Sequence, residues 1–239
     1  MHFLFEVLGY FAGITTYAVL RARRGDALSD ESRATILAGA ALGAMIGSRL
    51  LHWLCDPHLD LFSLIEGKTI LGGLLGGLIG VELAKKKIGI ERSTGDLLVA
   101  PLIIAIAIGR IGCFLTGPAD HTAGLPTNLP WGIAIGDGVP RHPVALYEIA
   151  FLLLLLPLTR LARREGDAFR IFLSSYLLFR LFVDFLKPDP RAIFGGLTSL
   201  QWACVAGLLY YGALQFIPSA ARDQRSRLRG SALERNSSG

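Results

Sequence analysis

The chain has 239 residues, of which 52% are hydrophobic and only 18% are charged. This composition excludes an ordinary soluble domain and indicates a polytopic membrane protein. The net charge of +5 comes from short basic clusters between apolar runs. That pattern is typical of loops that flank membrane helices, so we expect no nucleic-acid partner. The three cysteines lack the spacing of a metal site or a disulfide framework.

Seven apolar stretches approach the roughly 20 residues that are needed to span a bilayer. They cover approximately residues 2–21, 34–55, 69–84, 97–116, 143–162, 168–186 and 198–217. The first starts almost at Met1 with no basic segment before it, and we interpret it as a retained helix rather than a signal peptide. The sequence therefore predicts an all-α polytopic membrane protein of about seven transmembrane helices. These helices are expected to form a single domain over residues 1–217.

The orientation follows from the positions of lysine and arginine. These residues collect after the first, third and fifth stretches and in the tail, whereas connections 56–68, 117–142 and 187–197 hold few cations. The alternation predicts an N-terminus outside and a cytoplasmic C-terminus. Connection 117–142 is rich in turn-forming Pro and Gly, and we expect it to fold as an outer, periplasmic loop over the mouth of the bundle. Residues 218–239 are expected to form a basic, flexible cytoplasmic tail.

Arg110 lies near the end of the apolar stretch 97–116, between Gly109 and Gly112. An arginine in a membrane-length segment costs roughly 2.5–3.5 kcal/mol on insertion, so it should face a partner or a wet cavity rather than lipid. The flanking glycines permit a second backbone, or a ligand, to approach closely. Arg110 is therefore the first candidate site residue.

A second arginine, Arg180, lies four residues before Asp184 and hence on the same face of a helix. One interpretation is an internal ion pair that only locks the bundle. When Arg110 is included, two arginines face one nearby aspartate, and the surplus positive charge suits the bidentate binding of a phosphate. A lipid phosphate is the anion that we expect at that depth.

The segment from Arg141 to Glu148 leads from the outer loop into the fifth apolar stretch. The imidazole of His142 is suited to proton transfer, although a lone histidine before a helix is more often a cap or a surface residue. Glu148 lies inside the helix and must find a hydrogen-bond donor there. Tyr147 is a candidate site residue that, taken alone, is better explained as an interfacial anchor.

Further candidates lie in the first three stretches. The run Gly72–Gly80 repeats small residues, which indicates close helix packing or, in the sharper interpretation, a smooth wall for an acyl chain. Lys68, just before it, can reach a lipid headgroup or simply snorkel to the interface. Arg49 and Glu6 are intramembrane ionisable groups of lower rank.

Taken together, these residues resemble the prolipoprotein diacylglyceryl transferase family over nearly the whole chain, from about Phe5 to Gln201. Four motifs in order carry the resemblance: Gly109-Arg110-Ile111-Gly112-x-Phe114, Arg141-His142-Pro143-x-x-Leu146-Tyr147-Glu148, Phe179-Arg180-x-x-x-Asp184-Phe185 and Gly196-Leu197-Thr198-x-x-Gln201. The resemblance implies a multi-pass protein of the bacterial inner (plasma) membrane. It also implies transfer of the diacylglyceryl group of phosphatidylglycerol to the lipobox cysteine of a prolipoprotein. This step of lipoprotein biogenesis forms a thioether and releases glycerol phosphate, without a metal or a cofactor.

The resemblance also implies roles for individual residues. Arg110 and Arg180 would hold the phosphate and stabilise the leaving charge, with Asp184 and Glu148 orienting them. His142 is the first choice for the base that deprotonates the thiol, with Asp120 and Glu6 behind it. The positions expected to bind substrate are Arg49, Lys68, Gly112, Cys113, Gly124, Tyr147, Glu148 and Asp184.

The chain departs from the family's motifs at several positions. Cys113 stands where the family usually has Asn, and Asp120 and Gly124 are candidates for a displaced acid and glycine. A tyrosine expected near the start of the first span is replaced by Glu6. The family's His-Gly-Gly-Leu motif lacks its histidine here and reads Leu71-Gly72-Gly73-Leu74 or Leu75-Gly76-Gly77-Leu78.

Other functions remain open at this point. The departures are compatible with a divergent transferase that modifies a different thiol or hydroxyl, and with a non-catalytic relative that binds lipid without turnover. A transporter for amphipathic anions would also keep intramembrane arginines, but would more often show an internal repeat between its halves, and none is visible.

Overall fold

The computed structural model describes residues 2–26, 28–55, 67–117, 124–134, 138–188 and 194–216. Within these ranges the chain forms seven α-helices, three short 3-10 helices and one β-hairpin. The α-helices are α1 (His2–Arg24), α2 (Asp30–Cys55), α4 (Ile70–Ile88), α5 (Val99–Thr116), α6 (Val144–Leu158), α7 (Asp167–Val183) and α8 (Ser199–Phe216). The 3-10 helices are η1 (Asp96–Leu98), η3 (Thr159–Leu161) and η4 (Asp184–Leu186), and the strands are β1 (Ile133–Ala134) and β2 (Pro140–Arg141).

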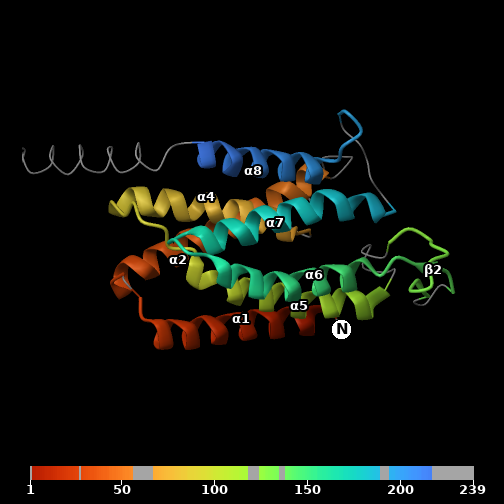
Figure 1. Cartoon of the computed structure of the whole chain (residues 1–239), viewed down its shortest axis with the longest axis horizontal. Helices are drawn as coiled ribbons and strands as arrows, with labels where there is room; N and C mark the ends of the chain where they lie inside the picture. Colours follow the sequence, from red (N-terminus) through yellow and green to blue (C-terminus); the bar gives the residue numbers. More distant parts are fainter. Residues whose placement is uncertain are drawn as a thin grey trace, which may run out of the picture.

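The helices lie side by side along the long axis of the molecule and reverse direction from each helix to the next (Figure 1). The predicted all-helical architecture is confirmed, and each of the seven apolar stretches overlaps one of these α-helices. Four helical segments of the described chain are long and apolar enough to cross a membrane by length and composition, namely His2–Arg24, Asp30–Cys55, Asp96–Thr116 and Val144–Leu161.

Local sequence chemistry explains where individual helices begin and end. At the start of α4, the side-chain oxygen of Thr69 accepts a hydrogen bond from Gly72 N at 3.1 Å, which satisfies one of the free donors of the first turn. At its other end, Gly89 takes the left-handed conformation with φ of 73°, which glycine adopts without a Cβ penalty. Pro157 lies in the last turn of α6, immediately before the chain changes to η3.

Small residues bring α2 and α4 into close contact along their lengths. A Cβ atom added to Gly47 would lie 2.5 Å from the carbonyl oxygen of Gly72, and one added to Gly39 would lie 2.8 Å from that of Gly80. The backbones of the two helices therefore touch where side chains would otherwise separate them. The packing interpretation of the Gly72–Gly80 run is confirmed, because the glycines Gly72, Gly76 and Gly80 face α2.

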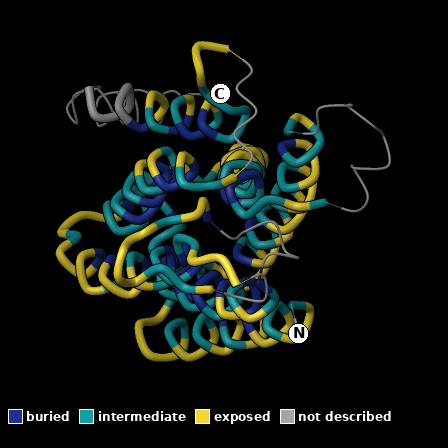
Figure 2. Tube along the Cα trace, turned by 90° about the vertical axis from the view of Figure 1, so that its right-hand side faces the viewer, coloured by how far each residue is buried: buried dark blue, intermediate teal, exposed yellow. Residues whose placement is uncertain are grey.

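The exterior of the bundle is apolar, as a lipid-facing surface requires. Figure 2 shows buried positions turned toward the middle of the bundle and exposed positions along its outer faces. Phe11, Ile14 and Leu154 are among the exposed side chains, whereas Phe172, Leu173 and Tyr176 of α7 are fully buried in the core. The chain is therefore a membrane protein whose polar groups collect inside or at the ends of the helices.

The described part of connection 117–142 contacts the ends of the helices. Strands β1 and β2 pair antiparallel, and Pro126 forms a further antiparallel bridge with Arg141. Leu125 N donates a 2.7 Å hydrogen bond to the carbonyl of Leu186, which ties this connection to the end of η4. The hairpin projects beyond the ends of α5, α6 and α7, at the end of the bundle where α1 begins (Figure 1).

Candidate functional site

Two buried arginines and a buried glutamate meet inside the bundle. Arg110 lies in the penultimate turn of α5, Glu148 in the second turn of α6 and Arg180 in the last turn of α7. Because α6 runs opposite to its neighbours, the start of α6 lies beside the ends of α5 and α7 (Figure 1). The three residues are distant in sequence and adjacent in space.

Glu148 is the centre of this cluster and is only 1% exposed. Its Oε2 lies 2.9 Å from Arg110 Nε and 3.4 Å from Arg180 Nη1, so one carboxylate oxygen pairs with both guanidinium groups. Its Oε1 accepts a 2.7 Å hydrogen bond from the hydroxyl of Tyr176. Each carboxylate oxygen therefore has a partner, which a buried charge needs to offset its desolvation.

The cluster continues into η4 through Asp184. Arg180 Nη2 donates a 2.9 Å hydrogen bond to Asp184 Oδ1, and Lys187 Nζ lies 3.1 Å from the same oxygen. Burial lowers the pKa of Lys187, which follows η4, to about 8, with a further lowering from the positive charge of Arg180. Three cations thus face two carboxylates, an arrangement that leaves one positive charge and favours an anion.

Arg110 also makes contacts on its other side. Its Nη1 lies 3.6 Å from the sulfur of Cys113, and that sulfur lies 3.7 Å from Nδ1 of His2 at the start of α1. Gly112 permits α5 to lie close to α1, since a Cβ on Gly112 would lie 2.7 Å from Cβ of Phe5. Gly112, which we expected to bind substrate, therefore has a clear packing function between α5 and α1.

A second polar group lies along the same face of α1. Glu6 pairs with Lys68, which precedes α4, and its Oε1 also accepts a 2.8 Å hydrogen bond from the hydroxyl of Tyr10. His2 lies one helical turn before Glu6 on the same face of α1. The ion pair with Lys68 therefore joins α1 to the segment that begins α4.

His142 and Tyr147 lie near the hairpin. His142 Nδ1 is 3.2 Å from the hydroxyl of Tyr147, and that hydroxyl also accepts a 2.9 Å hydrogen bond from Nε1 of Trp131. Gly124 N donates to the carbonyl of His142 at 3.1 Å, and a Cβ on Gly124 would lie 2.5 Å from that oxygen. Gly124 thus fits tightly against the strand that leads into α6.

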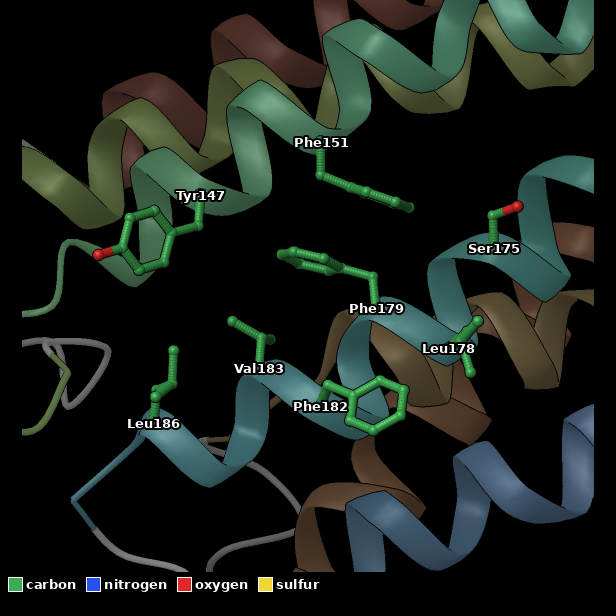
Figure 3. Close-up of a pocket in the computed structure, with 8 residues that line it drawn as sticks. All are labelled: Tyr147, Phe151, Ser175, Leu178, Phe179, Phe182, Val183 and Leu186. Atoms are coloured by element: carbon green, nitrogen blue, oxygen red, sulfur yellow. The ribbon is translucent and has the colours of Figure 1, made fainter.

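An open groove of about 650 Å³ runs between α6 and α7. Figure 3 shows its lining, in which Phe151 and Phe179 point toward one another and Tyr147 lies at one end. The two phenylalanine rings are stacked at 4.3 Å between centroids. Ser175 is the polar exception in a lining of aliphatic and aromatic side chains, so the groove suits a hydrocarbon chain.

The structure brings together five of the thirteen site residues that the sequence singled out. Arg110, Glu148, Arg180 and Asp184 form one network, and Cys113 touches its edge. Arg49 is exposed on α2. Asp120 lies outside the described residues.

Three members of the site were missed by the sequence reasoning. Tyr176 lies four residues before Arg180 on the same helix face, a spacing that would have identified it. Lys187 lies three residues after Asp184 and was hidden by the apparent end of the apolar stretch. His2 is one helical turn before Glu6, but its neighbour Cys113 could not be inferred from spacing, because it belongs to a different helix.

Comparison with known proteins connects this geometry to a reaction. A family model described as prolipoprotein diacylglyceryl transferase matches residues 3–217. A Geobacter sulfurreducens protein named phosphatidylglycerol–prolipoprotein diacylglyceryl transferase is 34% identical over 206 residues, which cover 79% of this chain and 78% of the relative. A Bordetella bronchiseptica protein of the same name is 33% identical over 188 residues, or 73% and 70% of the two chains. A Clostridium perfringens protein, named as the second such transferase, is 29% identical and covers 83% of this chain and 86% of its own length.

Proposed function

The chain belongs to the prolipoprotein diacylglyceryl transferase family, and on that basis we propose that it transfers the diacylglyceryl group of phosphatidylglycerol to the lipobox cysteine of a prolipoprotein. The product is a thioether, and glycerol phosphate leaves. The observation that carries the proposal is the buried pair Arg110 and Arg180, held together by the single carboxylate of Glu148.

The charge of this cluster matches the lipid headgroup. Arg110, Arg180 and Lys187 are opposed by Glu148 and Asp184, so the cluster keeps one positive charge. A phosphodiester carries one negative charge, and guanidinium groups bind phosphate oxygens through two parallel hydrogen bonds. Glu148 and Asp184 orient the guanidinium groups, and lipid binding completes the neutralisation.

The same arginines assist the chemical step. When the thiol sulfur attacks the glyceryl carbon next to the phosphate, the carbon–oxygen bond breaks and a second negative charge develops on the leaving phosphate. Fixed cations in a buried site stabilise that charge without reorganising. The groove between α6 and α7 supports the proposal from the apolar side, because an acyl chain can lie against Phe151 and Phe179 while the headgroup reaches Arg180.

We place the site near the outer surface of the bacterial inner membrane, in a multi-pass protein with seven spans. The basic residues at the opposite ends of the helices support this orientation. They include Arg21, Arg23 and Arg24 at the end of α1 and Lys85, Lys86 and Lys87 at the end of α4. The N-terminus is then outside, on the side from which a secreted prolipoprotein presents its lipobox.

The remaining site assignments are also proposals. Arg49 and Lys68 are placed as headgroup contacts, and Cys113, Gly112 and Gly124 shape the wall near the phosphate. Tyr147 lines the groove and contacts His142. The candidates for the base that takes the thiol proton are His142, Asp120, Glu6 and His2.

The test uses full-length protein in phosphatidylglycerol vesicles with a lipobox peptide, and mass spectrometry of the peptide. Arg110→Gln and Arg180→Gln are expected to slow adduct formation at least about 100-fold, which corresponds to the loss of a strong electrostatic contact in the transition state. Arg92→Gln is the matched control, because Arg92 pairs with Glu165 on the exposed surface.

Binding of the labelled lipid is measured on the same samples. Wild-type protein that binds phosphatidylglycerol without forming an adduct would support the non-catalytic alternative. Full activity in both Arg110→Gln and Arg180→Gln would refute the assignment of the phosphate site.

A further inference from the structure

The imidazole of His2 and the guanidinium of Arg110 both contact the sulfur of Cys113. The sulfur of Cys113 lies between them, 3.6 Å from Arg110 Nη1 and 3.7 Å from His2 Nδ1. His2 is partly buried, whereas Cys113 is 6% exposed. A partly buried imidazole and a buried thiol thus lie next to Arg110.

The attacking thiol needs a proton acceptor close to Arg110. The carbon that the thiol attacks is bonded to an oxygen of the phosphate, so the attacking sulfur must lie close to the group that binds the phosphate. A general base must come within about 3 Å of the proton that it removes. A base beside Arg110 meets this requirement.

We propose that His2 is the proton acceptor for the attacking thiol, an assignment that rests on the proposed transferase function. The sulfur of the acceptor cysteine forms a bond to the glyceryl carbon, and the carbon–oxygen bond to phosphate breaks. The electron pair leaves with glycerol phosphate, and the thiol proton moves to the imidazole of His2. Cys113 positions that ring beside Arg110.

The surroundings of His2 suit an imidazolium that forms during the reaction. On α1 itself, Glu6 lies one helical turn away on the same face. Tyr10 and Lys68 both contact Glu6, and α5 contributes Cys113 and Arg110. A carboxylate one helical turn away favours the protonated form of the ring electrostatically.

His142 is the competing histidine, and its contacts are of another kind. Its Nδ1 faces the hydroxyl of Tyr147, which is also bonded to the exposed indole of Trp131. These contacts place His142 beside two aromatic residues of the kind that anchor a protein at the membrane interface. Assigning the base to His2 or to His142 therefore predicts opposite results in the same experiment.

The experiment measures the rate of adduct formation between pH 5.5 and 8.5 with full-length protein, phosphatidylglycerol vesicles and a lipobox peptide. His2→Gln is expected to lower the rate at neutral pH by about 100-fold, within the usual range for a general base. It should also remove the decline of the rate on the acidic side. Binding of labelled phosphatidylglycerol should stay within about twofold of wild type, and free imidazole should partly restore activity to His2→Ala.

Two control variants complete the design. His52→Gln, in the last turn of α2, should leave both the rate and the pH profile unchanged. His142→Gln should retain the acidic limb.

The assignment would be overturned if His2→Gln kept the wild-type rate and pH profile, or if His142→Gln alone removed the acidic limb. Loss of lipid binding in His2→Gln would also overturn it, since His2 would then be a binding residue. A wild-type protein that forms no adduct would remove the proposed transferase function and this assignment together, whereas activity that needs Arg110 but not His2 would remove the assignment alone.

Discussion

Replacing Glu148 with glutamine tests whether this carboxylate holds the site together. Glutamine keeps the size of the side chain and can still accept the hydrogen bond from Tyr176, but it no longer neutralises Arg110 or Arg180. Two buried guanidinium groups then face each other with only Asp184 to balance them. Breaking a buried ion pair costs about 3–5 kcal/mol.

For a domain of this size, each kcal/mol lowers Tm by about 2–4 °C, so Glu148→Gln should lower Tm by roughly 10 °C. Thermal unfolding of the protein in detergent micelles measures this shift. Tyr176→Phe is the matched control, because it removes one hydrogen bond to Glu148 and keeps every charge. Its expected cost is only about 1–2 kcal/mol.

A double-mutant cycle decides whether the effect comes from the ion pair. If Arg110 and Glu148 are coupled, the variant with both replaced by glutamine should lose less stability than the sum of the two single losses. The difference should be at least about 1 kcal/mol. Strict additivity, or a Glu148→Gln variant that melts within about 2 °C of wild type, would refute the reasoning.

Further predictions concern packing and pH. Gly47→Ala should destabilise the protein by about 1–3 kcal/mol because its Cβ would meet the α4 backbone, whereas Gly77→Ala, with 3.5 Å to its nearest atom, should be neutral or stabilising in the same unfolding assay. A hydrogen bond from Arg33 lowers the pKa of Asp26. The wild-type protein should therefore be more stable than Asp26→Asn above about pH 4, and this difference should disappear as the pH falls further. Since burial lowers the pKa of Lys187 to about 8, stability should rise with pH between about 8 and 10, and Lys187→Met should flatten that rise in melts taken across this range.

The sequence was sufficient to predict features that depend on local periodicity or on the cost of burial. Arg180 and Asp184 were paired because residues four apart share a helix face, and the structure contains that ion pair. Arg110 and Glu148 were expected to need partners because charges in apolar segments always do. Arg110 and Glu148 pair with each other because of how α5 and α6 pack, and no local sequence pattern specifies that packing.

The contacts that could not be predicted are those between the paired helices. The contact between His2 and Cys113 depends on the register of α1 against α5, and Gly9 contributes to that register because a Cβ there would lie 2.7 Å from the carbonyl oxygen of Ala105. The Glu6–Lys68 pair depends likewise on where the chain re-enters the bundle before α4.

The pairing of α1 with α5 has a consequence for how the protein is made. Helix α2 packs on α4, the next α-helix among the described residues, so that pair can assemble soon after both are synthesised. Helix α1 packs mainly on α5, which the ribosome delivers only after α2 and α4 are complete. During that interval α1 carries Glu6 without the surface of α5, and Lys68, which emerges first, supplies an early counter-charge. The order of synthesis thus gives the first helix its ion-pair partner before its packing partner α5 arrives.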